Sequence, residues 1–365
     1  MDEQLVLHWL CCAPFLGAVA VRRLTERMDC PEQLYNIEET RLRAWGILTE
    51  RQTGLLMEWK EQKGACRQSL QRLREQGLVF VTPFEDSYPK RLLEIYDYPM
   101  GLFVRGNLSG LSAERPAVAI VGARSCSASG EQLAEEFARA LAAEQVEIIS
   151  GLAAGIDGAA HRGALKAGGG TCGVLGCGVN ICYPSQHYGL YEQMAERGCL
   201  ISEFPPDTPP RRENFPRRNR VISGLADAVL VVEAREKSGS LITAELGLEQ
   251  GREIFAIPGR VTDHLSGGCN QLIQQGAHMA VSPRDLLEYL GIKHRKILKL
   301  YEKNINGLAK KEKMVYSCLD FKPKHIDEIL SATGLSIGEC MSILMELELE
   351  GYVYRPANFY YGKKL

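Results

Sequence analysis

The chain has 365 residues, of which 45% are hydrophobic and 24% are charged, a composition typical of a globular protein with two or three domains. The net charge of −2 excludes a protein coated all over with positive charge for nucleic acid, although it allows a local cationic patch. The 12 cysteines are scattered and form no Cys-x-x-Cys pair, so we expect reduced, buried thiols and no metal site.

The first residues do not have the charge order of a secretory signal. Asp2 and Glu3 precede the first apolar residues and Arg22 and Arg23 follow them, whereas a signal peptide begins with positive charge. No apolar run reaches the length of a transmembrane helix. We therefore expect a cytoplasmic protein.

Residues 1–75 are predicted to form a small helical domain, because apolar residues recur in them at irregular helical spacing. Within this region, residues 14–24 could form a helix–hairpin–helix motif, in which glycines present backbone N–H groups to a DNA phosphate. The hairpin has one glycine, Gly17, so a packing or adaptor module is favoured over a motif that binds DNA.

Residues 80–290 alternate between short apolar runs and segments of helical length. The predicted strands are 79–82, 101–106, 117–121, 146–149, 171–175, 199–201, 228–232, 253–257 and 277–281. Strands that alternate with helices form a parallel sheet covered on both faces. The predicted class is therefore α/β, with an extended Rossmann-like doubly wound sheet flanked by helical N-terminal and winged-helix-like C-terminal domains.

Small and polar residues follow the predicted strands, at Gly122–Arg124, Ser150–Gly151 and Gly176–Gly178. The carboxyl ends of parallel strands lie on one edge of the sheet, where ligands bind in open α/β folds. Ser238–Ser240 begins a predicted helix and so offers free backbone N–H groups to an anion. Together with a predicted cationic turn at Arg217–Arg220, these segments predict an anion-binding crevice.

The C-terminal part consists of a predicted basic linker, 291–311, and a winged-helix-like domain, 312–362. Between Lys293 and Lys313 there are eight Lys or Arg residues and two acids, which we interpret as a solvated linker. Residues 334–354 contain no Lys or Arg and several glutamates, which phosphates would repel. The domain is therefore expected to contact protein rather than duplex DNA.

Two enzyme classes are alternatives. A dinucleotide enzyme needs GxGxxG after the first strand, whereas Gly122 is the only glycine of its loop, and NAD binding is disfavoured. A Rossmann-type nucleotide-binding protein or nucleoside-monophosphate hydrolase stays open, because Asp157, Glu203 or Glu233 could supply a carboxylate and His161 lies one turn from Asp157. Glu233 is interpreted as a structural partner of the arginine cluster.

The order of several short motifs points to a family. They are AIVGAR at 119–124, SGLAAGID at 150–157, VLGCG at 174–178 with Tyr183-Pro184, SEFP at 202–205, NFPRRNR at 214–220, SGSLITA at 238–244 and IPG at 257–259. In these motifs the sequence resembles the DNA-processing protein A family (DprA, also called Smf). The resemblance covers about Tyr88 to Ala280 and, more loosely, both ends.

The resemblance implies a binding protein rather than an enzyme. It implies sequence-independent binding of single-stranded DNA, protection of incoming DNA, loading of RecA recombinase in natural transformation and recombination, and a homodimer, with no cofactor and no metal. The segment 270–277 is similar to the part of the family that forms the dimer.

The same resemblance assigns candidate residues for DNA. Arg124 would contact the DNA backbone, the arginine cluster would line or brace the site, and the helix start would receive a phosphate. The predicted DNA-binding or phosphate-binding residues are Gly122, Arg124, Ser125, Gly151, Gly155, Arg217, Arg218, Asn219, Arg220, Ser238, Gly239, Ser240 and Thr243. Some relatives carry a lysine after Tyr-Pro that helps to hold DNA, whereas residues 185–190 here contain none.

Overall fold

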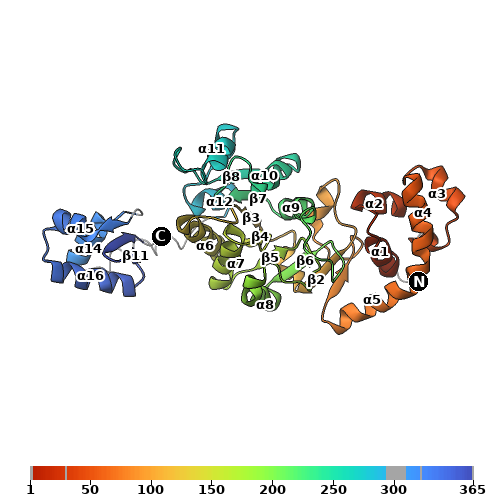
Figure 1. Ribbon diagram of the computed structural model, residues 1–365, viewed down its shortest axis with the longest axis horizontal. Helices are drawn as coiled ribbons and strands as arrows, with labels where there is room; N and C mark the ends of the chain where they lie inside the picture. Colours follow the sequence, from red (N-terminus) through yellow and green to blue (C-terminus); the bar gives the residue numbers. More distant parts are fainter. Residues whose placement is uncertain (1–2, 29–30, 293–309, 321–322, 364–365) are drawn as a thin grey trace. The chain divides into compact units, whose positions relative to one another are not determined.

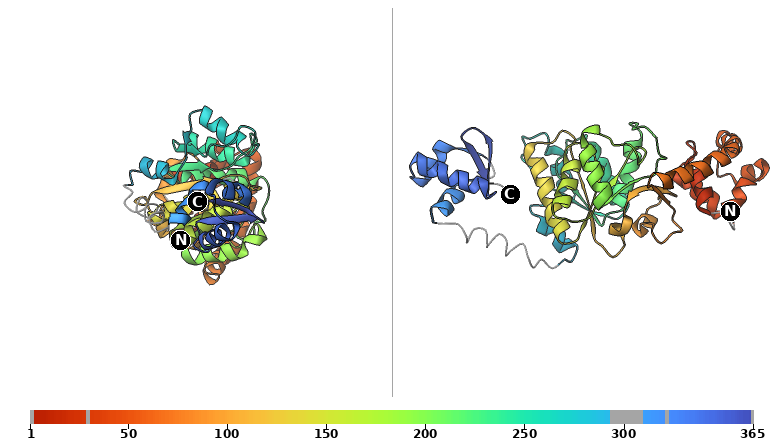
Figure 2. Two further views of the ribbon diagram at one scale, coloured as in Figure 1. Left: turned by 90° about the vertical axis from the view of Figure 1, so that its left-hand side faces the viewer. Right: turned by 90° about the horizontal axis from the view of Figure 1, so that it is seen from below.

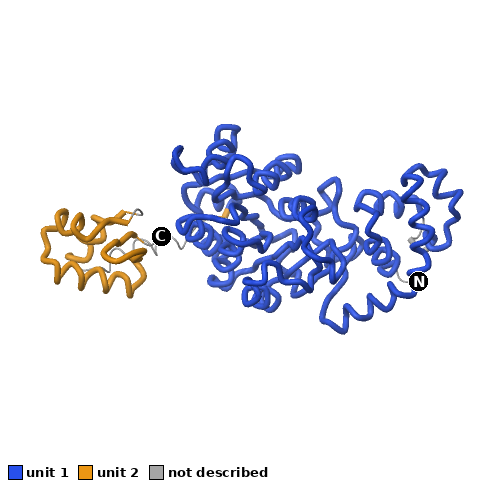
Figure 3. The backbone as a smooth tube through the Cα atoms, in the orientation of Figure 1, with its two compact units in different colours: residues 1–291 blue, residues 292–365 orange. Residues whose placement is uncertain are grey.

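The computed structural model describes residues 3–28, 31–292, 310–320 and 323–363. Its contacts divide the chain into two compact units, 1–291 and 292–365, which Figure 3 distinguishes by colour. Most of the predicted basic linker, residues 293–309, lies outside the described residues.

The first unit is built on a nine-stranded sheet with the order β1-β2-β6-β5-β4-β3-β7-β8-β9. The strands are β1 Val79–Val81, β2 Leu102–Gly106, β3 Ala117–Val121, β4 Glu147–Ser150, β5 Thr171–Val174, β6 Cys199–Ser202, β7 Ala228–Val231, β8 Glu253–Ala256 and β9 His278–Met279. From β6 to β9 all neighbouring strands pair in parallel, whereas β1 and β2 join antiparallel. The predicted parallel sheet is confirmed.

Helices cover both faces of this sheet (Figure 1). The helices α6 Ala128–Ala143, α7 Ile156–Lys166 and α8 Tyr188–Arg197 lie on one face, and α9 Asn214–Gly224 and α10 Gly239–Glu249 lie on the other. Neighbouring residues of β6 show the division, since Leu200 packs in the same cluster as Met194 of α8 and Ile201 packs with Val221 of α9. The chain runs outward from β3 to β6 and then returns to β7, so the loops after β3 and β7 flank the topological switch point.

The N-terminal part of this unit is helical, as predicted. Its helices are α1 Glu3–Cys11, α2 Ala18–Glu26, α3 Glu39–Trp45, α4 Glu50–Trp59 and α5 Lys63–Glu75. They share a core with the sheet, because Trp9 and Leu10 belong to the same buried cluster as Phe80 and Phe103. His8 also packs edge-on against Phe80, with ring centroids 5.1 Å apart.

The second unit is a winged helix, which confirms the predicted class. It contains α14 Lys310–Cys318, α15 Ile326–Thr333, α16 Ile337–Leu349 and a sheet of β10 Lys324–His325, β11 Val353–Ala357 and β12 Tyr360–Lys363 in the order β10-β12-β11. The hairpin β11–β12 is the predicted wing. Strand β10 was not predicted, because two residues are too short to show an alternating pattern.

One local prediction is wrong, since Arg217–Arg220 forms no turn and lies inside α9. Pro216 stands in the first turn, where its missing N–H removes no helical hydrogen bond, and arginine favours helices. Val221 and Ile222 then bury one face of the helix against the sheet. The cations are therefore carried by a packed helix. Figure 2 shows the ribbon of the chain from two further sides.

Among the described helices, none alone is long and apolar enough to cross a membrane, and one bent pair, α15 with α16, meets the test by length and composition only.

Candidate nucleic-acid interface

The loops that follow β3, β4 and β7 are joined by backbone hydrogen bonds. The N–H of Ala123 donates to the carbonyl of Glu233 over 2.7 Å, and the N–H of Ile156 donates to the carbonyl of Ala123 over 3.3 Å. Gly155 has a φ of +75°, and a side chain there would collide with the carbonyls of Ala123 and Arg124. A Cβ at Gly122 would lie 2.9 Å from the carbonyl oxygen of Glu233. The two glycines therefore allow the predicted loops to meet.

Arg124 lies over the ring of Phe215, which packs against Tyr183 at this edge. Its guanidinium carbon is 5.1 Å from the ring centre of Phe215, and that ring is 5.6 Å from Tyr183 at an angle of 34°. Gly176 supports the pair, since a Cβ there would lie 2.8 Å from the Phe215 ring. We call Tyr183 and Phe215 the aromatic shelf. Within the described part of the chain, the exposed Arg124 has no carboxylate at ion-pair distance.

Arg218 approaches the same shelf from inside the protein. It is buried, its guanidinium carbon is 6.0 Å from the centre of Phe215, and its Nη1 donates to the carbonyl of Val174. A side chain at Gly151 would collide with this guanidinium, so the predicted glycine makes room for an arginine. Burial lowers the pKa of Arg218 to about 10, which leaves it charged at neutral pH.

Asp157 and His161 do not form an open acid–base pair. The buried carboxylate of Asp157 accepts from the backbone N–H of Gly151 over 3.1 Å, and burial raises its pKa against the opposing effect of Arg218. The Nδ1 of His161 lies 2.7 Å from Thr171 Oγ1, and the Thr171 hydroxyl in turn donates to the carbonyl of Ile148. Burial lowers the pKa of His161 to about 3, so the ring is neutral at pH 7.

The arginines of α9 have different surroundings. Arg220 is buried and forms ion pairs with Glu203 at 2.5 Å and Asp97 at 3.1 Å. Arg217 is exposed, with its guanidinium carbon 5.6 Å from the ring centre of Phe204. Arg218 therefore lies near Arg124, Arg217 lies at the surface, and Arg220 is buried in ion pairs within the domain.

Glu233 is not a partner of these arginines, and that interpretation is wrong. Its carboxylate accepts from the N–H of Ser127 over 2.8 Å and from the Ser127 hydroxyl over 2.5 Å. It thereby ties the end of β7 to the start of α6. Since Glu203 pairs with Arg220 and Asp157 accepts backbone N–H groups, each carboxylate that was considered for a hydrolase has partners within the protein.

Helix α10 begins where the sequence predicts a helix start, but the N–H of Ser240 is not free, because the Ser238 side chain accepts from it. Ser238 is the N-cap, with its Oγ 3.4 Å from the N–H of Ser240 and 2.8 Å from the Ser240 hydroxyl. Asn219 joins α9 to this helix by donating to the carbonyl of Gly239 over 3.3 Å. Gly239 is exposed, whereas Ser240 and Thr243 are buried. The remaining predicted residue, Ser125, is exposed beside Arg124.

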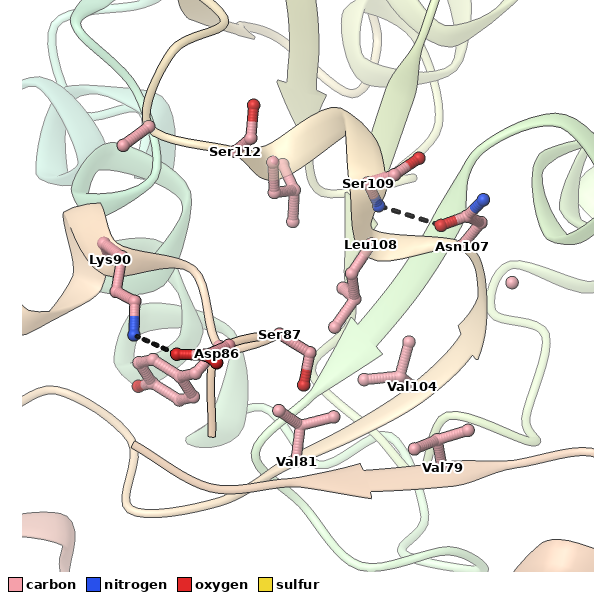
Figure 4. Close-up of a pocket in the computed structure, with 14 residues that line it drawn as sticks. Val79, Val81, Asp86, Ser87, Lys90, Val104, Asn107, Leu108, Ser109 and Ser112 are labelled. Atoms are coloured by element: carbon pink, nitrogen blue, oxygen red, sulfur yellow. Dashed lines mark hydrogen bonds and ion pairs between the residues drawn. The ribbon is translucent and has the colours of Figure 1, made fainter. Parts of the chain in front are cut away.

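A pocket lies away from this edge, between strands β1 and β2 and the segment 107–113 (Figure 4). It has a volume of about 530 Å³, an apolar wall that includes Val79, Val81 and Val104, and a rim on which Lys90 faces Asp86 at 4.0 Å. None of the predicted binding residues lines it. In the described residues, no group of three or more His, Cys, Asp and Glu side chains could hold a metal ion.

The family model described as DNA recombination-mediator protein A matches residues 79–291, and the model of the DprA winged helix domain matches residues 302–357. Protein Smf of Escherichia coli (strain K12) is 36% identical over 345 residues, which cover 90% of this chain and 92% of that protein. The chain belongs to the DNA processing protein A family. Another member, DNA processing protein DprA of Bacillus subtilis (strain 168), is 45% identical over 217 residues, which cover 60% of this chain and 73% of that protein.

Two solved structures of this family are similar to the chain. The crystal structure of DNA processing protein A from Streptococcus pneumoniae has a TM-score of 0.69 and 34% identity, and the match covers 79% of this chain and 98% of that one. The protein from Helicobacter pylori, described for its single-stranded DNA binding mode, has a TM-score of 0.53 and 27% identity, with 58% and 95% covered.

Proposed function

We propose that this protein binds single-stranded DNA at the carboxyl edge of its nine-stranded sheet. The observation that carries the proposal is Arg124, an exposed cation without a described acidic partner, lying on the aromatic shelf with the charged Arg218 behind it. A cationic groove beside aromatic rings is the combination that proteins use for single strands, because phosphates meet the cations and bases stack on the rings.

Phosphates are the main ligand in this proposal. Arg124 and Arg217 are exposed and would pair with them, and the exposed backbone at Gly239, with the Ser238 hydroxyl, would receive one at the helix start. Stacking on Tyr183 and Phe215 tolerates any base, so binding would be independent of sequence. Gly122 and Gly155 would let the protein backbone approach the DNA strand closely.

Other predicted residues are proposed to support this surface from below. Arg218 would add positive potential, and Gly151 would give it room. Arg220 would brace α9 through Glu203 and Asp97, while Asn219, Ser240 and Thr243 would fix the start of α10. Ser125 would extend the edge beside Arg124.

The wider role that we propose follows the family, in which such a protein protects incoming DNA and loads RecA recombinase on it during natural transformation. The single-stranded DNA binding named for the H. pylori relative supports the DNA ligand. A homodimer would form at the β9 end of the sheet, where Met279 and Val281 are 55% and 66% exposed next to the segment 270–277. The winged helix would contact a protein partner.

A paired assay tests this function against the hydrolase alternative. RecA strand exchange is followed on single-stranded DNA coated with single-strand binding protein, with and without this protein. In parallel, nucleoside monophosphates are incubated with it and the products are quantified. We expect faster strand exchange and no turnover. Turnover of a monophosphate without any effect on strand exchange would contradict the proposal and favour the hydrolase.

A further inference from the structure

A second cationic groove lies between α7 and α8, on one face of the sheet. Its volume is about 450 Å³, and its polar lining residues are Arg162, Lys166, Gln186, His187, Gln193 and Arg197. No Asp or Glu lines it, whereas three cations do. We call it the α7–α8 groove.

The groove opens at the same sheet edge as the aromatic shelf. His187, which lines the groove, has its Nδ1 3.1 Å from the carbonyl oxygen of Leu152, in the loop that carries Gly151 and Gly155. A Cβ at Gly158, in the first turn of α7, would lie 2.5 Å from His187 and 3.2 Å from Arg162. The absent side chain at Gly158 thus lets Arg162 and His187 meet beside that loop.

The cations of the groove differ in how far they are neutralised. Arg162 pairs with Glu131 and Lys166 pairs with Glu135, each at 2.5 Å, and both acids belong to α6. Arg197 is exposed and has no ion pair with a described carboxylate. The ion pairs of Arg162 and Lys166 are at the surface, so they contribute little to stability and can give way to another anion.

We propose that the α7–α8 groove binds the phosphates of the same DNA strand as it leaves the shelf. This rests on the proposed function and extends it from one site to a path. From Gly189 to Arg197 the groove follows α8 for roughly 12 Å at 1.5 Å per residue. At about 3.4 Å per phosphate, as in stacked DNA, it holds roughly three phosphates. The strand runs from Arg124 over the loop at Leu152 and down to Arg197.

The test measures the affinity of the full chain for fluorescent oligothymidylates of 6, 12 and 18 nucleotides. The affinity of the wild type is expected to be at least tenfold higher for the longer oligonucleotides than for the hexamer. This gain excludes the increase that arises because a longer oligonucleotide offers more positions at which to bind. Arg197→Glu is expected to remove most of this gain and to leave binding of the hexamer within about twofold. Gln193→Glu is a second variant with an exposed side chain in the same groove.

Two further variants test whether affinity follows the charge of the groove itself. Glu135→Gln frees Lys166 and is expected to raise affinity for the longer oligonucleotides by about threefold. Arg72→Glu changes the charge by the same amount as Arg197→Glu but at an exposed position of α5, and it is expected to change nothing. Melting temperatures of all variants check that the fold is kept.

The outcomes separate this proposal from the proposed function. The groove proposal fails, and the proposed site at the shelf stands, if hexamer binding depends on Arg124 but affinity does not rise with oligonucleotide length. The same conclusion follows if affinity rises with length equally in the wild type, Arg197→Glu and Gln193→Glu. Equal losses in Arg72→Glu and Arg197→Glu also overturn it, since they show an effect of net charge alone. If no oligonucleotide binds, both proposals fail.

Discussion

The carboxyl edge of the sheet and helix α16 of the winged helix are opposite in character, although a winged helix is the fold more often connected with DNA. At the sheet edge, Arg124 and Arg217 are exposed without a described ion-pair partner, next to aromatic rings. The exposed side of α16 instead carries Ile337, Met345 and Leu349, which are 61%, 58% and 85% exposed. We infer from this difference that exposed charge, rather than fold type, marks the proposed DNA-binding surface.

The acids of the second unit complete this contrast. Glu346 and Glu350 are exposed near the apolar residues of α16, and the only basic partner of an α16 glutamate in the described residues is Lys311, paired with Glu339 at 2.8 Å. A helix of this kind is repelled by the phosphates of a major groove. Its apolar side chains suit a protein surface, in agreement with the protein contact that we propose for this unit.

The largest effect is expected from Arg220, which tests whether an arginine of the motif can be structural. Arg220→Met leaves the nearly buried Glu203 without its partner, so the free energy of unfolding should fall by about 3–5 kcal/mol. Thermal or urea unfolding measures this. The double variant Arg220→Met/Glu203→Gln should recover part of the loss, and an unchanged stability of the single variant would contradict the bracing role.

The next effect in size concerns Arg124. Arg124→Ala removes an exposed charge, so the affinity for single-stranded DNA should fall about 10-fold to 100-fold, the value of a charged hydrogen bond. The melting temperature should stay within about one degree. Fluorescence anisotropy gives the affinity, with Arg72→Ala as the matched variant. Unchanged binding would place the DNA site elsewhere.

A smaller loss is expected when the shelf loses one ring. Phe215→Ala should cost about 1 kcal/mol of binding free energy, the lower end of the value for one stacked base, because Arg124 already lies over the same ring. Phe215→Tyr keeps the ring and should bind within about twofold of the wild type. If the alanine variant binds normally, the contacts are to phosphate alone and the rings serve only to position Arg124.

The smallest effect is expected from changing the sign of charge on α16. Glu346→Lys with Glu350→Lys should leave the affinity for single strands unchanged and add weak duplex binding that disappears at high salt. Gel shifts with a short duplex measure this. Strong duplex binding by the wild type that persists at high salt and is unchanged in this variant would contradict the contrast between the two regions.

Much of the fold could be predicted from the sequence because the strands are short apolar runs closed by small residues. The loops at Gly122, Gly151 and Ser238 were found in this way, and their meeting at one edge follows from parallel pairing. The resemblance to the family then supplied Arg124, which the structure leaves exposed without a described carboxylate partner.

The rest depended on contacts between distant residues. The sequence did not show that Arg218 points into the protein beside Gly151 while Arg217 faces solvent. The segment was predicted as a turn, so helical periodicity was not used to assign a direction to each arginine. The partners of Arg220 are Asp97, which lies far before it in the sequence, and Glu203, which lies 17 residues before it. Glu233 was wrongly interpreted as a partner of these arginines. We propose that ion pairing of this kind withholds Arg220 from DNA, whereas Arg124 and Arg217 stay available to it.

The salt dependence of single-strand affinity is the most direct measurement of the central claim. The logarithm of the binding constant is followed against the logarithm of salt concentration for the wild type and Arg124→Ala. We predict a steep linear fall, with a slope that is shallower by about 0.7 in the variant, as expected when one phosphate contact is lost from a single strand. A wild-type affinity that is insensitive to salt, or identical slopes for the two proteins, would contradict a site built on Arg124 and phosphates.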